Sequence, residues 1–397
     1  MGYLGRSPTP SPIDTSDIPA NSIDASKIID GSIELAEIAD NSITDAKLNS
    51  SKLDGIETGA TNYIHPTTHA TADIADNAIT EAKIADAAVV SLKSGRKNLI
   101  INGGFDVWQR GTSFTNTTDV AYRSDRWKHQ NRQSSQSDIT LLTNQDVVGT
   151  NMNVYKFTVD TPPTDSSLLI NQFIEEGSFT LIGKTVTASW YARQSTGSGV
   201  TSNINFEVDG GTTFLGSANT LTSSWQRFTQ TFTFSGYTAA SVSDSSLRTL
   251  LYFKNTAASD VIEVTGVQLE LGSVATDFEH RSYGEELALC QRYFWKWSGG
   301  ATYAVLGNAW VSSANTLWVT VPFPVTLRTG SPTISLGGSF QNRTNSSAIT
   351  AWSASGDGLS PNSVTFNFTS SGLSGGEATA VRATNDTSAY ISADAEL

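Results

Sequence analysis

An aliphatic residue at every fifth position is the feature that most constrains how the N-terminal part of this chain can fold. The positions hold only isoleucine and leucine: Ile13, Ile18, Ile23, Ile28, Ile33, Ile38, Ile43, Leu48 and Leu53. Because 38% of the chain is hydrophobic, nine successive matches in one register have a chance probability on the order of 10⁻⁴. A period of five fits neither an α-helix nor the alternation of a strand. The pattern therefore predicts a repeat of short turns over residues 13–97, interrupted at 54–73.

One chain carries too little apolar surface in this region to fold alone. Before residue 98 the only aromatic residues are Tyr3 and Tyr63, so burial depends on a single aliphatic stripe. Three identical chains could bury their stripes along one axis. We therefore expect a homotrimeric stalk, and the alternative is a disordered linker of low complexity. The residues expected at the trimer axis are Ile23, Ile28, Ile33, Ile38, Ile43, Leu48, Ile79 and Ile84.

His69 lies on the stripe, because the pattern resumes one residue out of register after the interruption. A trimer would bring three imidazoles together at the axis, where a metal could bind. Pro66 excludes a continuous helix, and no acidic or cysteine partner lies at ligand spacing. We expect no metal and no cofactor, with His69 as a weak candidate only.

Charge and cysteine content exclude several classes of function. The chain has 25 Lys and Arg against 38 Asp and Glu, and a net charge of −13 argues against binding to a phosphate backbone. The single cysteine, Cys290, cannot form an intramolecular disulfide and is expected to pack in a short helix. Residues 1–12 lack the basic start and apolar core of a signal peptide, and no apolar run is long enough to span a membrane. We expect cytoplasmic synthesis without membrane insertion.

From Lys97 onward the period of five is lost and all nine tryptophans appear, which predicts globular domains. Short alternating segments joined by Gly, Ser and Thr loops predict a jelly-roll-like β-sandwich over 98–282. Ser282 opens a capping box for a linker helix over 283–297. A second β-sandwich is predicted over 298–397. The clearest predicted strands are 185–192, 225–234, 267–271, 304–310, 316–323, 333–336, 349–352, 364–368, 379–382 and 390–393.

Several of these segments resemble a known family. Asn98–Gly103, Trp108–Gly111, Asp125–Trp127 and Val267–Gly272 are similar to the carbohydrate-binding-module-like domain of bacteriophage tail fibres and related virion proteins. The stalk units, and the segment Leu53–Asn62, resemble phage fibre repeats. The C-terminal segments Cys290–Phe294, Val321–Val325 and Ile391–Leu397 resemble the distal domains of the same proteins.

The resemblance implies a virion fibre that docks through residues 1–12 and binds a bacterial surface polysaccharide. Sugars are held by aromatic faces flanked by amides, carboxylates or arginine. Alternatively, Trp108 and Trp127 are packed in a core, and Asp125 and Arg126 pair with each other or with the backbone. The candidate sugar-binding residues are Trp108, Asp125, Arg126, Trp127, Tyr191, Trp310, Trp318 and Trp352.

No catalytic motif stands in a convincing structural context, so we expect a structural and adhesive protein without enzymatic activity. The implied role is that of a phage tail fibre. Two alternatives are a capsid-attached decoration fibre and a polysaccharide depolymerase or deacetylase, because carboxylates far apart in sequence can converge in the fold.

Overall fold

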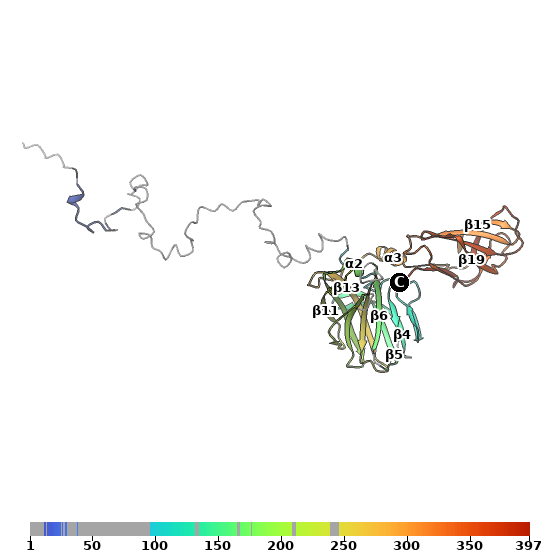
Figure 1. Ribbon diagram of the computed structural model, residues 1–397, viewed down its shortest axis with the longest axis horizontal. Coiled ribbons are helices and arrows are strands. Elements are labelled where there is room, and N and C mark those ends of the chain that lie inside the picture. The colour runs from blue at the N-terminus through green and yellow to red at the C-terminus, as the bar shows by residue number, and fades with distance from the viewer. Residues whose placement is uncertain are drawn as a thin grey trace, which may run out of the picture. The chain divides into compact units, whose positions relative to one another are not determined.

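The computed structural model describes residues 12, 14–24, 26, 28–29 and 38, and then 96–397 except for 132–134, 165–166, 176, 209–211 and 239–245. The contacts between residues divide the chain into two compact units, Met1–Ala78 and Ile79–Leu397. In the first unit the described residues include a 3-10 turn, η1 (Thr15–Asp17), drawn in blue in Figure 1. It follows Asp14, whose carboxylate accepts a hydrogen bond from the Ser16 backbone. No helix in the described ranges is both long enough and apolar enough to cross a bilayer.

Most of the predicted stripe lies outside the described residues. This applies to Ile33, Ile43, Leu48, Ile79 and Ile84, and also to His69. The stripe residues that are described are solvent-exposed in the single chain: Ile18 at 44%, Ile23 at 55%, Ile28 at 43% and Ile38 at 39%. The trimeric stalk stays a prediction.

The middle domain is built from two antiparallel sheets. The first sheet has the order β1 (Ser113–Thr117), β4 (Gln136–Val147), β5 (Thr150–Thr161), β13 (Val261–Leu271), β7 (Thr185–Thr196) and β11 (Gln226–Thr233). The second has the order β10 (Asn219–Thr220), β8 (Thr201–Val208), β12 (Leu247–Lys254), β6 (Ser167–Ile174), β3 (Lys128–Gln130) and β2 (Val120–Tyr122), with β9 (Thr212–Leu215) beside β8. A short helix, α2 (Gly177–Thr180), follows β6.

Alternation of apolar side chains explains how these sheets face each other. On β7, Val186, Ala188, Trp190 and Ala192 are fully buried, as their spacing predicted. On β13 the buried series shifts from even to odd positions at a bulge near Gly266, whose φ is +59°. The two inner faces form one hydrophobic core, so the prediction of a β-sandwich is confirmed here.

The C-terminal domain is a second antiparallel arrangement of two sheets. It begins with α3 (Tyr283–Gln291), whose N-cap Ser282 accepts a hydrogen bond from the Glu285 backbone at 3.3 Å. The smaller sheet has the order β14 (Phe294–Ser298), β22 (Tyr390–Asp394) and β17 (Thr333–Gly337). The larger sheet has the order β18 (Phe340–Asn342), β21 (Ala378–Ala383), β15 (Val305–Ser313), β16 (Thr316–Pro322), β20 (Ser363–Thr369) and β19 (Ala351–Leu359).

The helix is shorter than predicted, because residues 294–298 form a strand. Helix α3 ends at Gln291, and β14 pairs with β22 from Phe294 opposite Asp394 to Ser298 opposite Tyr390. Trp295 points into the core, where its ring lies 5.3 Å from that of Phe323. Aromatic residues favour strands, and the available partner strand decides between the two conformations.

Both sheets of the C-terminal domain contribute one face to a shared core. Trp295, Ile391 and Ala393 of the smaller sheet meet Val319 and Phe366 of the larger one. Because successive side chains of a strand point to opposite faces, the remaining residues of each sheet face outward. The two outer faces therefore lie on opposite sides of this sandwich.

Cys290 is fully buried on α3, in agreement with the predicted structural role. Burial, and then the nearby carboxylates of Asp125 and Glu286, raise the pKa of its thiol well above the ordinary value. Since the thiolate is the reactive form, we expect a thiol-reactive dye to leave Cys290 unmodified in the native protein and to label it completely in urea. Rapid labelling under native conditions would contradict this burial.

Candidate functional site

Two tryptophans lie side by side on the outer face of the larger C-terminal sheet. Trp310 of β15 is directly opposite Trp318 of β16, and their ring centres are 6.3 Å apart at an interplanar angle of 72°. Trp310 is 56% exposed and Trp318 is 40% exposed. Their neighbours Ala309, Val311 and Val319 point into the core, so strand alternation requires both rings to face solvent. We call these two residues the tryptophan pair.

Polar, uncharged groups surround the tryptophan pair. Asn367 of β20 is the direct cross-strand neighbour of Trp318 on its other side. On the same face the hydroxyls of Thr320 and Thr365 are hydrogen-bonded at 2.9 Å. Strands β15, β16 and β20 contain no Asp, Glu, Lys or Arg. Across these three strands the face therefore combines large apolar rings with an amide and hydroxyls, without a charged side chain.

Trp352, the third C-terminal candidate, does not join the pair. It lies on the edge strand β19 opposite Phe368, a core residue, and its ring is 5.9 Å from that of Phe366 in an edge-to-face arrangement. This ring covers the open edge of the sandwich, although 37% of the residue remains exposed. The structure thus brings together two of the three predicted tryptophans.

Of the two tryptophans predicted for a sugar site in the middle domain, Trp127 is buried, which corrects that prediction, whereas Trp108 is partly exposed and stays a prediction. Trp127 is completely buried and donates to the carbonyl of Asn102 at 2.8 Å. Trp108 donates to the carbonyl of Phe105 at 2.8 Å and stacks on Tyr155. Stacking on a sugar requires an open aromatic face, which the fully buried Trp127 lacks.

Asp125 and Arg126 are also buried: Arg126 contacts the C-terminal domain directly, and Asp125 positions Gln109 and Arg110, which contact it. Asp125 accepts from the Gln109 backbone at 2.6 Å and from the Arg110 guanidinium at 3.3 Å, and burial raises the pKa of this carboxyl to about 6. Arg126 pairs with Glu396, donates to the carbonyl of Phe173 and stacks over the ring of Tyr293 at 3.5 Å. These contacts correct the prediction that the two residues bind sugar.

Residues 394–397 complete this connection, which we call the interdomain joint. Arg110 contacts Asp394 at 3.3 Å and Glu396 at 3.4 Å. The hydroxyl of Tyr122 donates to the carbonyl of Leu397 at 2.8 Å. The interdomain joint thus consists of Gln109, Arg110, Tyr122, Asp125 and Arg126 from the middle domain and Tyr293, Phe294, Asp394, Glu396 and Leu397 from the C-terminal domain.

Tyr191 is half-buried on the outer face of β7. The guanidinium of Arg227 lies 5.7 Å from its ring centre, and a side chain at Gly266 would collide with the ring. Within the described part of the chain no aromatic ring pairs with that of Tyr191 as Trp310 and Trp318 pair with each other, so the structure favours the C-terminal face as the candidate site.

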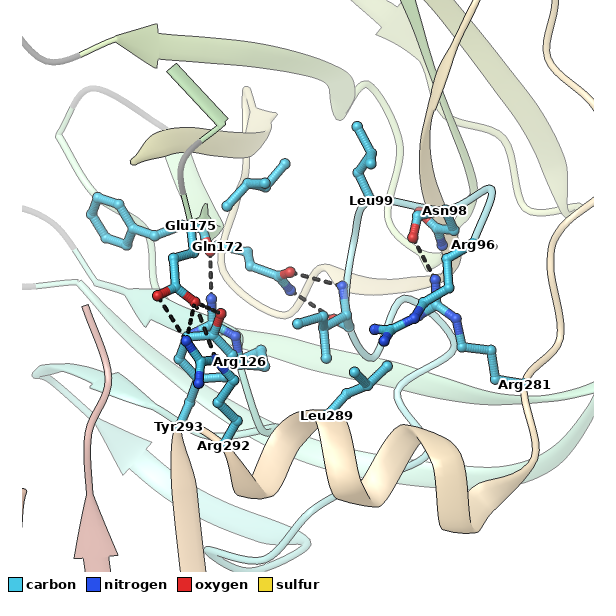
Figure 2. A pocket seen from close by; sticks show the side chains of 13 residues that line it. Arg96, Asn98, Leu99, Arg126, Gln172, Glu175, Arg281, Leu289, Arg292 and Tyr293 are labelled. Atoms are coloured by element: carbon cyan, nitrogen blue, oxygen red, sulfur yellow. Dashed lines mark hydrogen bonds and ion pairs between the residues drawn. The ribbon is translucent and has the colours of Figure 1, made fainter. Parts of the chain in front are cut away.

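Figure 2 shows a pocket of about 460 Å³ where α3 meets the middle domain. Arg292 forms three hydrogen bonds with Glu175, and the amide of Gln172 bonds to both backbone groups of Ile101. The Nε atoms of Arg126 and Arg281 have no partner among the described residues, but they are sealed from solvent. Most of the other polar groups that line the pocket are hydrogen-bonded to the protein, which leaves few of them to bind a ligand. This pocket is therefore part of the contact between the two β domains.

Comparisons with known proteins give only distant similarity. No family model matches the chain, and no curated protein matches its sequence. A CBM4 carbohydrate-binding module is 20% identical over 43% of this chain and 98% of that chain, with a TM-score of 0.29. The TmCBM61 module in complex with β-1,4-galactotriose is 12% identical over 45% and 100%, with a TM-score of 0.29. A cyclase from Fischerella sp. TAU is 12% identical over 46% and 100%, with a TM-score of 0.32.

Proposed function

We propose that this chain is an adhesive fibre without enzymatic activity, and that it binds a polysaccharide through the tryptophan pair. The observation that carries this proposal is the position of Trp310 and Trp318, exposed beside Asn367 on three strands that contain no charged residue. Soluble proteins seldom expose neighbouring large aromatic residues without a binding role.

The chemistry of this face matches that of a sugar. A pyranose ring presents C–H groups that pack against aromatic faces, while its hydroxyls hydrogen-bond to amides and hydroxyls. The angle of 72° between the two indole rings prevents both from lying flat on one planar surface. The pair is therefore suited to contact a single glycan chain from two directions.

The fibre part of the proposal is supported by the sequence. The aliphatic period of five and the resemblance to phage fibre segments favour a homotrimeric stalk that presents jelly-roll-like domains at a distance from a virion. Residues 1–12 would dock to the virion, and the C-terminal sandwich would serve in receptor binding and host adsorption. A phage tail fibre is the preferred role, and a capsid-attached fibre is the alternative.

The stalk can be tested by placing charges on its stripe. We expect Ile28→Asp combined with Ile38→Asp to lower the mass measured by sedimentation from trimer to monomer, because six carboxylates would meet at the axis. A matched control places the same charges off the stripe, as Ile29→Asp combined with Leu35→Asp, and should remain trimeric. An unchanged mass in the stripe variant would show that other parts of the chain hold the assembly.

The proposed function is tested by applying the labelled full chain to an array of bacterial surface polysaccharides. Saturable binding to a polysaccharide that stays intact supports adhesion. Release of reducing ends or of acetate from the bound polysaccharide would instead identify the protein as a depolymerase or a deacetylase. Absence of binding across the array would overturn glycan recognition, and the virion protein that copurifies with residues 1–12 would distinguish tail from capsid attachment.

A further inference from the structure

A pocket of about 400 Å³ lies over the outer face of the smaller C-terminal sheet. The register of that sheet aligns Lys296, Ser392 and Ser335 across β14, β22 and β17, and it aligns Phe294, Asp394 and Thr333 in the next row. The volume lies within the range of small-molecule sites, about 300–1,000 Å³. Because it lies on the opposite side of the sandwich from the tryptophan pair, this pocket is a separate surface.

The polar groups of the pocket are available to a ligand. The hydroxyls of Thr333, Ser335, Ser392 and Tyr390 form no hydrogen bond with any other residue that the structure describes. Elsewhere in the domain, hydroxyls facing each other are paired, as Thr344 and Thr379 are at 2.8 Å. Four unpaired hydroxyls in one pocket can both donate and accept, which suits a polyhydroxylated ring.

One positive charge in the pocket lacks a compensating carboxylate. Arg110 lies 3.6 Å from the ring centre of Phe294 and pairs with Asp394 of the pocket at 3.3 Å, and it also pairs with Asp125 and Glu396 outside the pocket. The ammonium of Lys296 lies 4.7 Å from the ring centre of Tyr390 and forms no ion pair within the described part of the chain. A ligand carboxylate could therefore pair with Lys296 without displacing an existing ion pair.

We propose that this pocket binds one carboxylate-bearing pyranose, a uronic acid unit of a polysaccharide. The carboxylate pairs with Lys296, and the ring hydroxyls bond to Ser335, Ser392 and Thr333. This assignment shares with the proposed function the premise that the protein binds glycans, but it uses none of the residues of the tryptophan pair. It gives the C-terminal sandwich two binding faces of different charge preference.

The test is calorimetric titration of the full chain with trigalacturonate and with its methyl ester, which keeps the rings and removes the charges. We expect the acid to bind more tightly, and more so at low salt, because the interaction is electrostatic. Lys296→Met should weaken binding of the acid roughly tenfold and leave the ester unchanged. Equal binding of acid and ester, or an unaffected Lys296→Met variant, would overturn the assignment.

Two further variants separate this site from the rest of the protein. In Gly337→Ala, the new Cβ would lie 2.2 Å from Cε1 of Tyr390 and displace that ring, so binding of both acid and ester should weaken. Trp310→Ala combined with Trp318→Ala should leave trigalacturonate binding unchanged. If this double variant no longer binds trigalacturonate while Lys296→Met still binds it, the assignment of the second site is wrong. If trigalacturonate binds, but the double variant binds every polysaccharide as well as the wild type does, only the proposed function is wrong.

Discussion

Replacing Trp310 and Trp318 together by alanine is expected to weaken polysaccharide binding by roughly 100-fold or more. Truncation of a tryptophan at the centre of a binding surface commonly costs about 2 kcal/mol or more, and the two rings contribute jointly because they face the same ligand. The measurement is the affinity of the full chain for the polysaccharide identified on the array. Since both rings are exposed, the thermal melting temperature should change little.

Trp352 provides a matched control for this prediction. It is the same residue type in the same sheet, but its ring packs edge-to-face on Phe366. Trp352→Ala should therefore lower stability and leave the affinity unchanged. Binding that survives loss of the tryptophan pair but fails in Trp352→Ala would move the site to the sheet edge at β19.

Replacing Arg126 by methionine is expected to destabilise the protein by about 3 kcal/mol or more, because it leaves the buried carboxylate of Glu396 with only the more distant Arg110, at 3.4 Å, as a partner. Arg126 is 1% exposed, and the side chain of Glu396 is 4% exposed. The loss would also remove the hydrogen bond to the carbonyl of Phe173 and the stacking on Tyr293. Urea unfolding of the variant, compared with the wild type, measures the change in free energy.

A double-mutant cycle shows whether the pair itself is responsible. Glu396→Gln removes the charge that Arg126 neutralises, so Arg126→Met with Glu396→Gln should be less destabilised than the sum of the single variants. A coupling energy of about 1 kcal/mol or more is expected. Additive effects would mean that Arg126 acts through packing on Tyr293 rather than through the ion pair.

Strand positions were largely predictable because alternation is a local property. The hairpin of β15 and β16 illustrates this, since Ala309 and Val311 alternate with Trp310, and Val319 follows Trp318. Closing that hairpin brings the two tryptophans opposite each other, so the candidate site could be found from nearby residues. The end of α3 was missed because the aromatic segment 294–298 forms a strand only beside residues 390–394, about a hundred positions away.

The role of Asp125 and Arg126 could not be predicted for the same reason. Their aromatic and charged neighbours have the composition of a sugar site, but Arg126 pairs with Glu396, which is 270 positions away. The pocket around Lys296 is likewise assembled from three strands that are distant in sequence. Sequence spacing identifies which residues face outward, whereas tertiary contacts decide which of them share a surface.

The interdomain joint also determines how a pulling force would pass through the molecule. The chain enters the C-terminal sandwich through β14 and returns through β22, and these two strands are hydrogen-bonded neighbours. Both are fastened to the middle domain, through Phe294 on one strand and Asp394 on the other. Tension applied at the tryptophan pair would therefore be shared by two parallel attachments. Such an arrangement resists detachment more strongly than a single linker, because both attachments must break together.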